Sequence, residues 1–248
     1  MASYDPGTKS VVVRIVYDGS GLAGKTRTLR WVSDAFAART GPLYVPAESG
    51  SGRTLYFDWL ELDGGHFVNE AGRAHPLRVE LVTVPGQSAY VQRRYGLLRS
   101  CDAVISVLDS TPKGLRRAAP GLRFLHAALA ELGSAAPPLV VQANKQDLPF
   151  AQSAASVRRA LSIGADVDVV ETSAATGAGV REALVKAIQR ARGHVRGALG
   201  GRAPTWLAPN QSTPESLYRR MRAFEAEHAD HLPGELLADR LLGEQLRA

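Results

Sequence analysis

Short runs of apolar, often β-branched residues alternate along the chain with longer stretches in which apolar residues recur every three or four positions. Runs of the first kind predict buried strands, and stretches of the second kind predict amphipathic helices. Their alternation predicts an α/β fold, with a mostly parallel sheet covered by helices on both faces. The six expected strands cover residues 11–17, 55–62, 77–84, 103–109, 139–144 and 167–171, and the expected helices cover residues 25–38, 87–98, 121–132, 153–161 and 179–192.

The same pattern divides the chain into four parts. Residues 1–10 form an N-terminal tail, and residues 11–192 hold all the expected strands in one domain. Within that domain the turn-rich residues 63–76 predict a hairpin between the second and third strands. Residues 193–213 contain Gly and Pro at short intervals and predict a linker. Residues 214–248 then form a helical extension.

The extension begins with a helix over residues 214–228 that places Leu217, Met221 and Phe224 on one face. A second short helix is expected after Pro233. Helices of this length are marginal on their own in water. We therefore expect the extension to dock, and docking on the main domain of the same chain is favoured over docking on a partner.

Composition and charge narrow the class of protein. The net charge is +6, but the arginines are scattered and lack interleaved aromatic residues, so no nucleic-acid partner is expected. No apolar run is long enough to cross a bilayer, and neither end shows a signal or lipidation pattern, so we expect no direct membrane anchor. Cys101 is the single cysteine, which favours a reducing compartment and a cytoplasmic location.

The first candidate site lies between the first expected strand and the helix after it. Its sequence matches the G-x-x-x-x-G-K-[ST] pattern, whose glycines let successive backbone N–H groups point at a phosphate at the start of a helix. Lys25 is expected to bridge the β- and γ-phosphates and to act in catalysis, and the Thr26 hydroxyl to ligate Mg²⁺. The alternative is a glycine-rich turn that matches by chance. The expected phosphate-binding residues are Gly19, Ser20, Gly21, Leu22, Ala23, Gly24, Lys25, Thr26 and Arg27.

A second motif follows the strand expected at residues 139–144 and has the N-K-x-D form. Asp147 is suited to accept hydrogen bonds from N1–H and the 2-amino group of guanine, which adenine does not offer in that arrangement. Asn144 is expected to contact the opposite edge of the base, and the stem of Lys145 to cover the ring. After the last strand, Ser173 and Ala174 complete the expected base site, with the Ala174 N–H directed at guanine O6. Buried polar pairing of this kind rejects the wrong base strongly.

Two segments between these anchors are placed to sense a γ-phosphate. Gly86 is expected to contact it through its backbone N–H, and Gln87 to orient the attacking water. Thr54 is the expected second hydroxyl ligand for Mg²⁺, beside Thr26. The sequence therefore predicts GTP or GDP and Mg²⁺ as the ligands of this domain.

Over residues 11–192 the chain resembles the bacterial small GTPases of the gliding-motility MglA type, within the Ras-like superfamily. The resemblance rests on residues 15–17 ahead of the phosphate loop and on residues 53–58, 83–87 and 144–149. Its most specific feature is Thr83, which stands where most Ras-like proteins have the aspartate of an Asp-x-x-Gly motif. Asp18 departs from the family, which usually has an aromatic residue there, and strand alternation is expected to turn its carboxylate away from the phosphates.

The resemblance implies a Ras-like P-loop three-layer sandwich, with a six-stranded, mostly parallel sheet and one antiparallel edge strand. It also implies a role in cell polarity or gliding motility, and a Roadblock-fold partner that stimulates hydrolysis. Arg53 maps onto the arginine that the family supplies from its own switch, where a fixed positive charge stabilises the transferring phosphoryl group. The alternative for Arg53 is a solvated loop residue.

The function expected from the sequence is that of a GTP/GDP molecular switch with Mg²⁺-dependent GTP hydrolysis. The alternative is a scaffold that holds GTP or GDP and hydrolyses little. A P-loop kinase is disfavoured, because the chain shows no lid for a second substrate and its N-K-x-D motif selects guanine. Effectors of polarity or motility are the expected partners.

Overall fold

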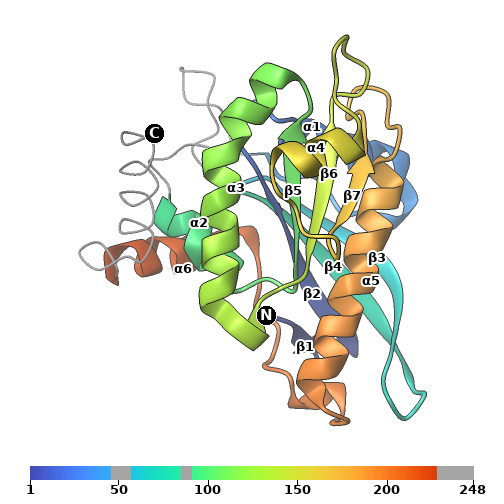
Figure 1. Cartoon of the computed structure of the whole chain (residues 1–248). Helices are drawn as coiled ribbons and strands as arrows, with labels where there is room; N and C mark the ends of the chain where they lie inside the picture. The colour runs from blue at the N-terminus through green and yellow to red at the C-terminus, as the bar shows by residue number, and fades with distance from the viewer. Residues whose placement is uncertain (46–56, 85–90, 228–248) are drawn as a thin grey trace.

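The computed structural model describes residues 1–45, 57–84 and 91–227. Its centre is one seven-stranded sheet in the order β3-β4-β2-β5-β6-β7, with β1 paired to the start of β2 (Figure 1). Strands β2, β4, β5, β6 and β7 run parallel, whereas β3 is antiparallel to β4 and β1 is antiparallel to β2. The strands are β1 (Ser3–Asp5), β2 (Ser10–Asp18), β3 (Trp59–Val68), β4 (Ala74–Thr83), β5 (Ala103–Asp109), β6 (Leu139–Asn144) and β7 (Asp168–Glu171).

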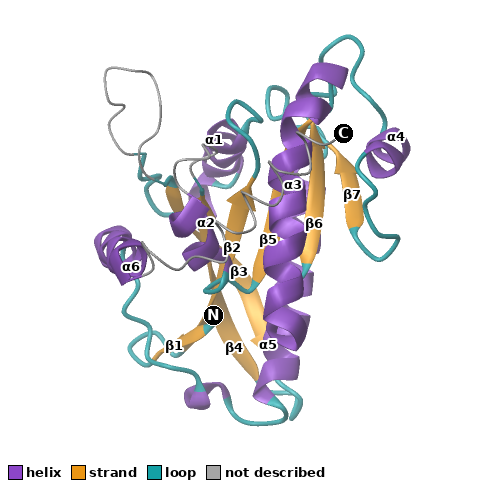
Figure 2. Ribbon diagram, turned by 60° about the vertical axis from the view of Figure 1, so that its left-hand side comes forward, coloured by secondary structure: helices purple, strands orange, loops and turns teal. Residues whose placement is uncertain are grey.

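Helices cover both faces of this sheet and enclose two separate cores (Figure 2). Helices α2, α3, α4 and α6 contribute to one core, and α1 and α5 to the other. The three-layer α/β class expected from the sequence is thereby confirmed. The helices are α1 (Lys25–Ala35), α2 (Val91–Leu98), α3 (Pro112–Leu132), α4 (Ala154–Ala160), α5 (Val180–Leu199) and α6 (Pro214–Glu227), with 3₁₀ turns at Ala37–Arg39, Gly133–Ala135 and Pro204–Trp206.

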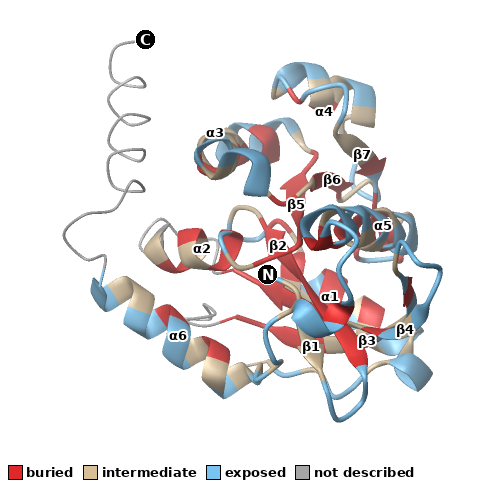
Figure 3. Ribbon diagram, turned by 90° about the horizontal axis from the view of Figure 1, so that it is seen from below, coloured by how far each residue is buried: buried red, intermediate tan, exposed pale blue. Residues whose placement is uncertain are grey.

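Strand β2 shows how alternation assigns side chains to the two cores. Ile15 and Tyr17 are buried among residues of α1 and α5, whereas Val16 lies in the core beneath α2 and α3. The whole strand is buried, as Figure 3 shows for the centre of the sheet. Successive side chains of a strand point to opposite faces. Arg14 and Asp18, two residues from Val16 on either side, therefore face the α2 side.

The N-terminal residues were expected to be a tail, but Ser3–Asp5 form β1 and make the sheet seven-stranded instead of six-stranded. The turn that allows this is built by Asp5, whose Oδ1 accepts hydrogen bonds from the backbone N–H groups of Gly7 and Thr8. Such a side-chain turn brings a short segment back onto its neighbour. Three residues are too few for a periodicity signal, so the sequence pattern did not reveal the strand.

The hairpin between β3 and β4 was expected, but its strands run further than the sequence indicated. They continue to Val68 and resume at Ala74, so the turn is shorter than residues 63–76. The register shifts between Asp63 and Gly65, so the two glycines after Asp63 lie in a local irregularity of the strand and do not end it.

Helix α3 begins at Pro112, nine residues before the expected start at residue 121. Thr111 caps the helix by accepting a hydrogen bond from the Gly114 N–H, and proline is favoured in a first helical turn. Gly114 and Pro120 both lie inside this helix, and neither ends it. Close packing explains why glycine stands at position 114, since a Cβ there would overlap the Asp109 side chain.

Helix α5 also runs beyond its expected end at residue 192 and continues to Leu199. Val195 and Leu199 extend its buried stripe, and Gly193 lies on its exposed face, so the apolar period outweighs the glycines. The segment expected to be a linker therefore begins as helix. No helix in residues 1–45, 57–84 and 91–227 is long and apolar enough to cross a membrane.

The first helix of the C-terminal extension docks on its own chain, as the sequence predicted. Helix α6 lies beside α2, and its Leu217 and Met221 are buried in the core on that face (Figures 1 and 3). The second helix expected after Pro233 falls outside the described residues.

Candidate nucleotide-binding site

The two sequence motifs meet at the carboxyl ends of the parallel strands. The phosphate loop follows β2, and the Asn144–Asp147 motif follows β6, with β5 between these two strands. Loops after the carboxyl ends of an open α/β sheet are where such folds bind ligands. The tertiary structure therefore brings together two segments that lie more than 100 residues apart.

The phosphate loop is wound into conformations that glycine tolerates best. Gly19 and Gly24 have φ angles of 139° and 110°. Helix α1 begins directly after Gly24, and no side chain caps its start, so the first N–H groups of the helix are available to an anion. Among the other loop residues expected to bind phosphate, Gly21, Leu22 and Arg27 are exposed, Ser20 is half-buried and Ala23 is buried.

Lys25 is a buried cation poised over this loop. Its Nζ donates hydrogen bonds to the backbone carbonyls of Gly19 (2.8 Å) and Ser20 (2.9 Å). Burial lowers the pKa of Lys25 to about 8, against the raising effect of the negative charge of Asp18. An anion bound in the loop would offset the cost of burying the Lys25 charge, because its negative charge would stabilise the ammonium group more than the two neutral carbonyls do.

Gly24 joins the phosphate loop to the second motif by close packing. A Cβ on Gly24 would overlap Asn144 Nδ2, which donates a hydrogen bond to the Ala23 carbonyl (2.8 Å). On its other side, Asn144 Oδ1 accepts hydrogen bonds from the Ala174 N–H (2.9 Å) and the Thr172 hydroxyl (3.2 Å). Asn144 is buried, and both the nitrogen and the oxygen of its side-chain amide are hydrogen-bonded to protein. It therefore cross-links three loops. Only a contact with the edge of the base was expected from the sequence.

Asp147 is the exposed carboxylate of the base motif. The Ser173 hydroxyl donates to its Oδ1 at 2.5 Å, which fixes the direction of the carboxylate. Within the described residues the structure gives no partner to Oδ2. One side of Asp147 is therefore oriented by protein, and the other is open to a ligand that carries N–H donors.

Lys145 is held at the mouth of the site by a residue that sequence reasoning missed. Its Nζ donates to Asp109 Oδ2 at 2.8 Å, and Asp109 is the last residue of β5. Burial alone would raise the pKa of Asp109, but hydrogen bonds from Lys145 and Thr111 outweigh it and hold that pKa below its usual range. The sequence did indicate that Asp109 has a partner, since a charged residue at the carboxyl end of a buried strand has to be paired.

Asp58 is the second residue that sequence reasoning did not assign. It is fully buried at the start of the β3 hairpin, and its Oδ2 accepts hydrogen bonds from the hydroxyls of Thr26 (2.7 Å) and Thr83 (2.9 Å). The Asp58 N–H donates back to Thr83 Oγ1 at 2.8 Å. Asp58 thus connects the first turn of α1 to the end of β4.

Comparison with known proteins agrees with this arrangement. Residues 72–191 match the model of the Arf (ADP-ribosylation factor) family. The chain is 33% identical over 186 residues to the mutual gliding-motility protein MglA of Myxococcus xanthus (strain DK1622), and the alignment covers 74% of this chain and 92% of that relative. The chain belongs to the MglA-type family of Ras-like small GTPases.

Small GTPases as a class bind GTP and GDP together with Mg²⁺, and this MglA-type chain has residues that fit the metal. Asp58 Oδ1 is buried without a hydrogen-bond partner among the described residues, close to the Thr26 hydroxyl. A carboxylate oxygen, a hydroxyl and phosphate oxygens are the ligands that Mg²⁺ prefers. No cluster of three or more His, Cys, Asp or Glu that could hold a metal occurs in residues 1–45, 57–84 and 91–227.

Thr83, the most specific feature of the resemblance, is in direct contact with Asp58. The Asp58 carboxylate lies across the hairpin, against the Thr83 hydroxyl. The Thr83 N–H donates to the Asp58 carbonyl at 3.0 Å, so the two residues are held side by side. The Thr83 hydroxyl donates a hydrogen bond to Asp58 Oδ2 and so orients the Asp58 carboxylate.

Asp18 departs from the family, and its carboxylate is taken up by α2. Arg94 donates to both Asp18 oxygens at 2.6 Å, and strand alternation places Asp18 on the same face of the sheet as α2, a face that the expectation from the sequence did not specify. Four residues expected to act on the γ-phosphate and Mg²⁺ lie outside the described residues. These are Arg53, Thr54, Gly86 and Gln87.

Proposed function

We propose that this chain is a GTP/GDP molecular switch that hydrolyses GTP with Mg²⁺. The observation that carries the proposal is Asn144, which is hydrogen-bonded to both the phosphate loop and the Ala174 loop. That bonding fixes the distance between a phosphate cradle and a base-reading carboxylate. One nucleotide that spans both sites fits this arrangement.

The base site favours guanine. Asp147 presents a carboxylate oriented by Ser173, and guanine offers two N–H donors on one edge. Hydrogen bonds to charged groups contribute about 1.5–3 kcal/mol each. We propose that Asp147 accepts from N1–H and the 2-amino group, that Lys145 lies along the ring, and that Ser173 and Ala174 complete the pocket.

We propose the following roles in hydrolysis. Lys25 binds the β- and γ-phosphates, and its positive charge opposes the charge that builds up on the transferring group. Asp58 and Thr26 hold Mg²⁺, which would neutralise phosphate charge when bound. Residues outside the described ranges complete the site: Gln87 orients water, Gly86 contacts the γ-phosphate, Thr54 adds a metal ligand, and Arg53 stabilises the transition state.

Replacing Gln87 by alanine is expected to slow hydrolysis of preloaded GTP by about 10²-fold, because positioned proton-transfer and water-orienting groups contribute on that scale. GTP affinity should change little. The measurement is single-turnover hydrolysis with Mg²⁺. Gln92→Ala, a half-buried glutamine in α2, is the matched control and should retain the wild-type rate.

Three outcomes of that experiment separate the possibilities. A wild-type protein that does not load GTP would refute the nucleotide site itself. A protein that loads GTP but turns it over no faster than Gln87→Ala would favour a nucleotide-holding scaffold. Measurable turnover that falls with the substitution supports the switch enzyme.

Replacing Asp58 by asparagine is expected to raise the Mg²⁺ concentration needed for half-maximal hydrolysis by at least about 10- to 100-fold, because losing even a group that only supports a metal ligand costs that much. The amide keeps an oxygen to accept from Thr26 and Thr83, so the fold should persist. A Mg²⁺ titration of single-turnover hydrolysis measures this shift. Asp102→Asn alters another buried, hydrogen-bonded aspartate at the opposite end of the sheet and should leave the titration unchanged. An unaltered midpoint in Asp58→Asn would contradict the metal role.

The cellular role proposed here follows the family. The relative is named for gliding motility, so we propose that this chain acts in bacterial cell polarity or motility, from the cytoplasm. We also propose that a Roadblock-fold partner stimulates its hydrolysis. Stimulation of single-turnover hydrolysis by such a partner would support this, and unchanged rates at saturating partner would refute it.

A further inference from the structure

Helix α6 packs along α2, the helix that follows the segment holding Gly86 and Gln87. Leu217 and Met221 are buried against it, and the Phe224 ring lies 6.3 Å from the Tyr95 ring, centroid to centroid. A Cβ on Gly96 would lie only 3.0 Å from Phe224, so the two helices are in close contact. The matched family model ends at residue 191, well before α6. Helix α6 therefore lies outside the matched family region and covers α2.

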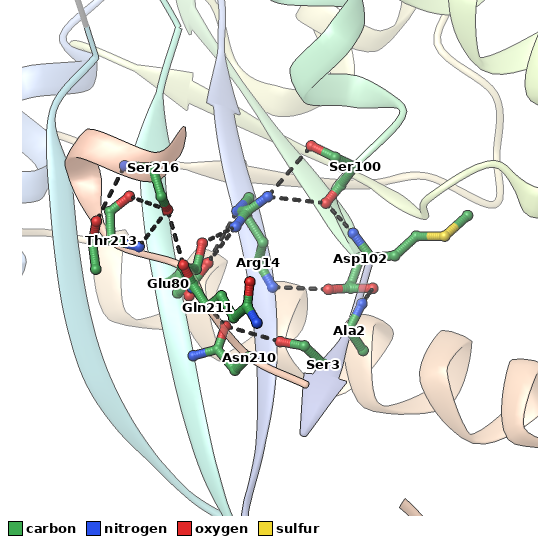
Figure 4. Close-up of polar contacts among 12 residues, drawn as sticks. Ala2, Ser3, Arg14, Glu80, Ser100, Asp102, Asn210, Gln211, Thr213 and Ser216 are labelled. Carbon is green, nitrogen blue, oxygen red and sulfur yellow. Dashed lines mark hydrogen bonds and ion pairs between the residues drawn. The ribbon is translucent and has the colours of Figure 1, made fainter. Parts of the chain in front are cut away.

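The segment that leads into α6 is anchored to the sheet (Figure 4). Arg14 pairs with Glu80 at 2.7 Å in the buried α2 face of the sheet, and it also donates to Ser212 Oγ at 2.6 Å. One residue later, Thr213 and Ser216 cap the start of α6 by exchanging hydrogen bonds between hydroxyl and backbone N–H. The helix is thus fixed in place before it reaches α2.

Two neighbouring arginines of α2 connect α6 to the nucleotide site. Arg93 donates to Glu225 of α6 at 3.0 and 2.8 Å. Arg94 donates to Asp18 at 2.6 Å through two nitrogens and to the Gly121 carbonyl at 2.7 Å. Arg94 forms a bidentate pair with both oxygens of the buried Asp18, an arrangement that is geometrically demanding and sensitive to misplacement. Both Arg93 donors reach a single oxygen of Glu225, whose side chain is 26% exposed.

Asp18 stands immediately before Gly19, the first residue of the phosphate loop. Its carboxylate is 1% exposed and needs its cation, because a buried carboxylate without one is strongly unfavourable. The charges of Asp18 and Arg94 both act on Lys25, with opposite sign. If Arg94 moved away, a bare negative charge would remain beside the site of the phosphates.

We propose that α6 is a positioning element for the nucleotide site: through Arg93–Glu225 it holds α2 so that Arg94 stays on Asp18, and it thereby slows nucleotide release. This inference rests on the proposed function. Coupling between sites is reciprocal, so a nucleotide that changes the position of α2 also changes how firmly α6 docks. Glu225 and Arg94 act through other residues, Asp18 acts through its charge, and none of the three is placed in contact with the nucleotide.

The test measures release of fluorescent GDP from the full chain. Glu225→Gln and Arg94→Ala should each accelerate release by about five-fold or more, the lower end of measured couplings between sites. Glu227→Gln removes the same charge from the exposed end of α6 and should release GDP at the wild-type rate. Adding Asp18→Asn to Arg94→Ala should slow release again, because the repelling charge is gone. Asp18→Asn would also relieve the instability of an unpaired buried charge, so denaturant unfolding of each variant is measured beside GDP release. Release rates that change only in step with the free energy of unfolding would overturn the inference.

Hydrogen exchange of the α6 amides shows in each variant whether the helix has left α2. Faster exchange in Glu225→Gln with an unchanged GDP release rate would overturn the inference and leave guanine-nucleotide binding intact. Faster release in Arg94→Ala that Asp18→Asn does not slow would overturn the charge-based route. A wild-type chain that binds no GDP would instead overturn the proposed function, and this inference with it.

Discussion

Replacing Asp147 by asparagine is expected to weaken GDP binding by about 10²- to 10⁴-fold. The carboxylate is proposed to accept two hydrogen bonds from guanine, each contributing about 1.5–3 kcal/mol, and a tenfold change in affinity corresponds to about 1.4 kcal/mol. The fold should tolerate the change, because Asp147 is exposed and the asparagine oxygen can still accept from Ser173. Equilibrium binding of fluorescent GDP, followed by competition with unlabelled nucleotides, measures the effect.

The same substitution should change which base the site accepts. An asparagine N–H pairs with the 2-oxo group of xanthine, so xanthosine diphosphate should compete better than GDP in Asp147→Asn. Asp166→Asn changes an exposed aspartate of another loop and serves as the control, with wild-type affinity expected. Unchanged GDP affinity in Asp147→Asn would show that the Asn144–Asp147 motif does not read guanine here.

Replacing Gly24 by alanine is expected to abolish measurable nucleotide binding and to lower the free energy of unfolding by about 2–6 kcal/mol. A side chain at a φ of 110° is strained by about 1–3 kcal/mol. The new Cβ would also displace Asn144 Nδ2 from the Ala23 carbonyl, and losing a buried hydrogen bond costs about 1–3 kcal/mol. Denaturant unfolding and GDP titration measure the two effects separately.

Gly72→Ala separates strain from overlap. Gly72 also has a positive φ, of 74°, but a Cβ there meets nothing within 4 Å. It should cost only about 1–2 kcal/mol and leave nucleotide binding intact. If Gly24→Ala bound GDP as the wild type does, the close contact between the phosphate loop and Asn144 would not be needed to form the site.

The motifs could be predicted from the sequence because each depends on a few consecutive residues. A phosphate loop needs a strand, a glycine turn and a helix in direct succession, and residues 19–26 provide them. The strands Ala103–Asp109 and Leu139–Asn144 have the bounds expected from their apolar runs, because a strand buried on both faces is marked along its whole length. The guanine motif then falls at the end of such a strand.

Asp58 shows what the sequence could not provide. Its contacts with Thr26 and Thr83 come from three different segments, and the register between β3 and β4 decides that they meet. A shift of one residue would turn Asp58 to the other face of the sheet. The sequence shows a threonine at position 83, but only the pairing of strands shows that the Asp58 carboxylate lies against it.

For the C-terminal extension, too, one part could be predicted from the sequence and another could not. Its apolar stripe requires cover, so docking on the same chain could be predicted from the sequence, whereas the choice of α2 as the docking surface could not. That choice depends on Arg14 holding Ser212 and on Arg93 meeting Glu225, contacts between residues 198 and 132 positions apart. Local patterns encode elements and motifs because their causes lie within a few residues. Ion pairs and register across the sheet depend on the packing of the whole chain, and only the tertiary structure decides them.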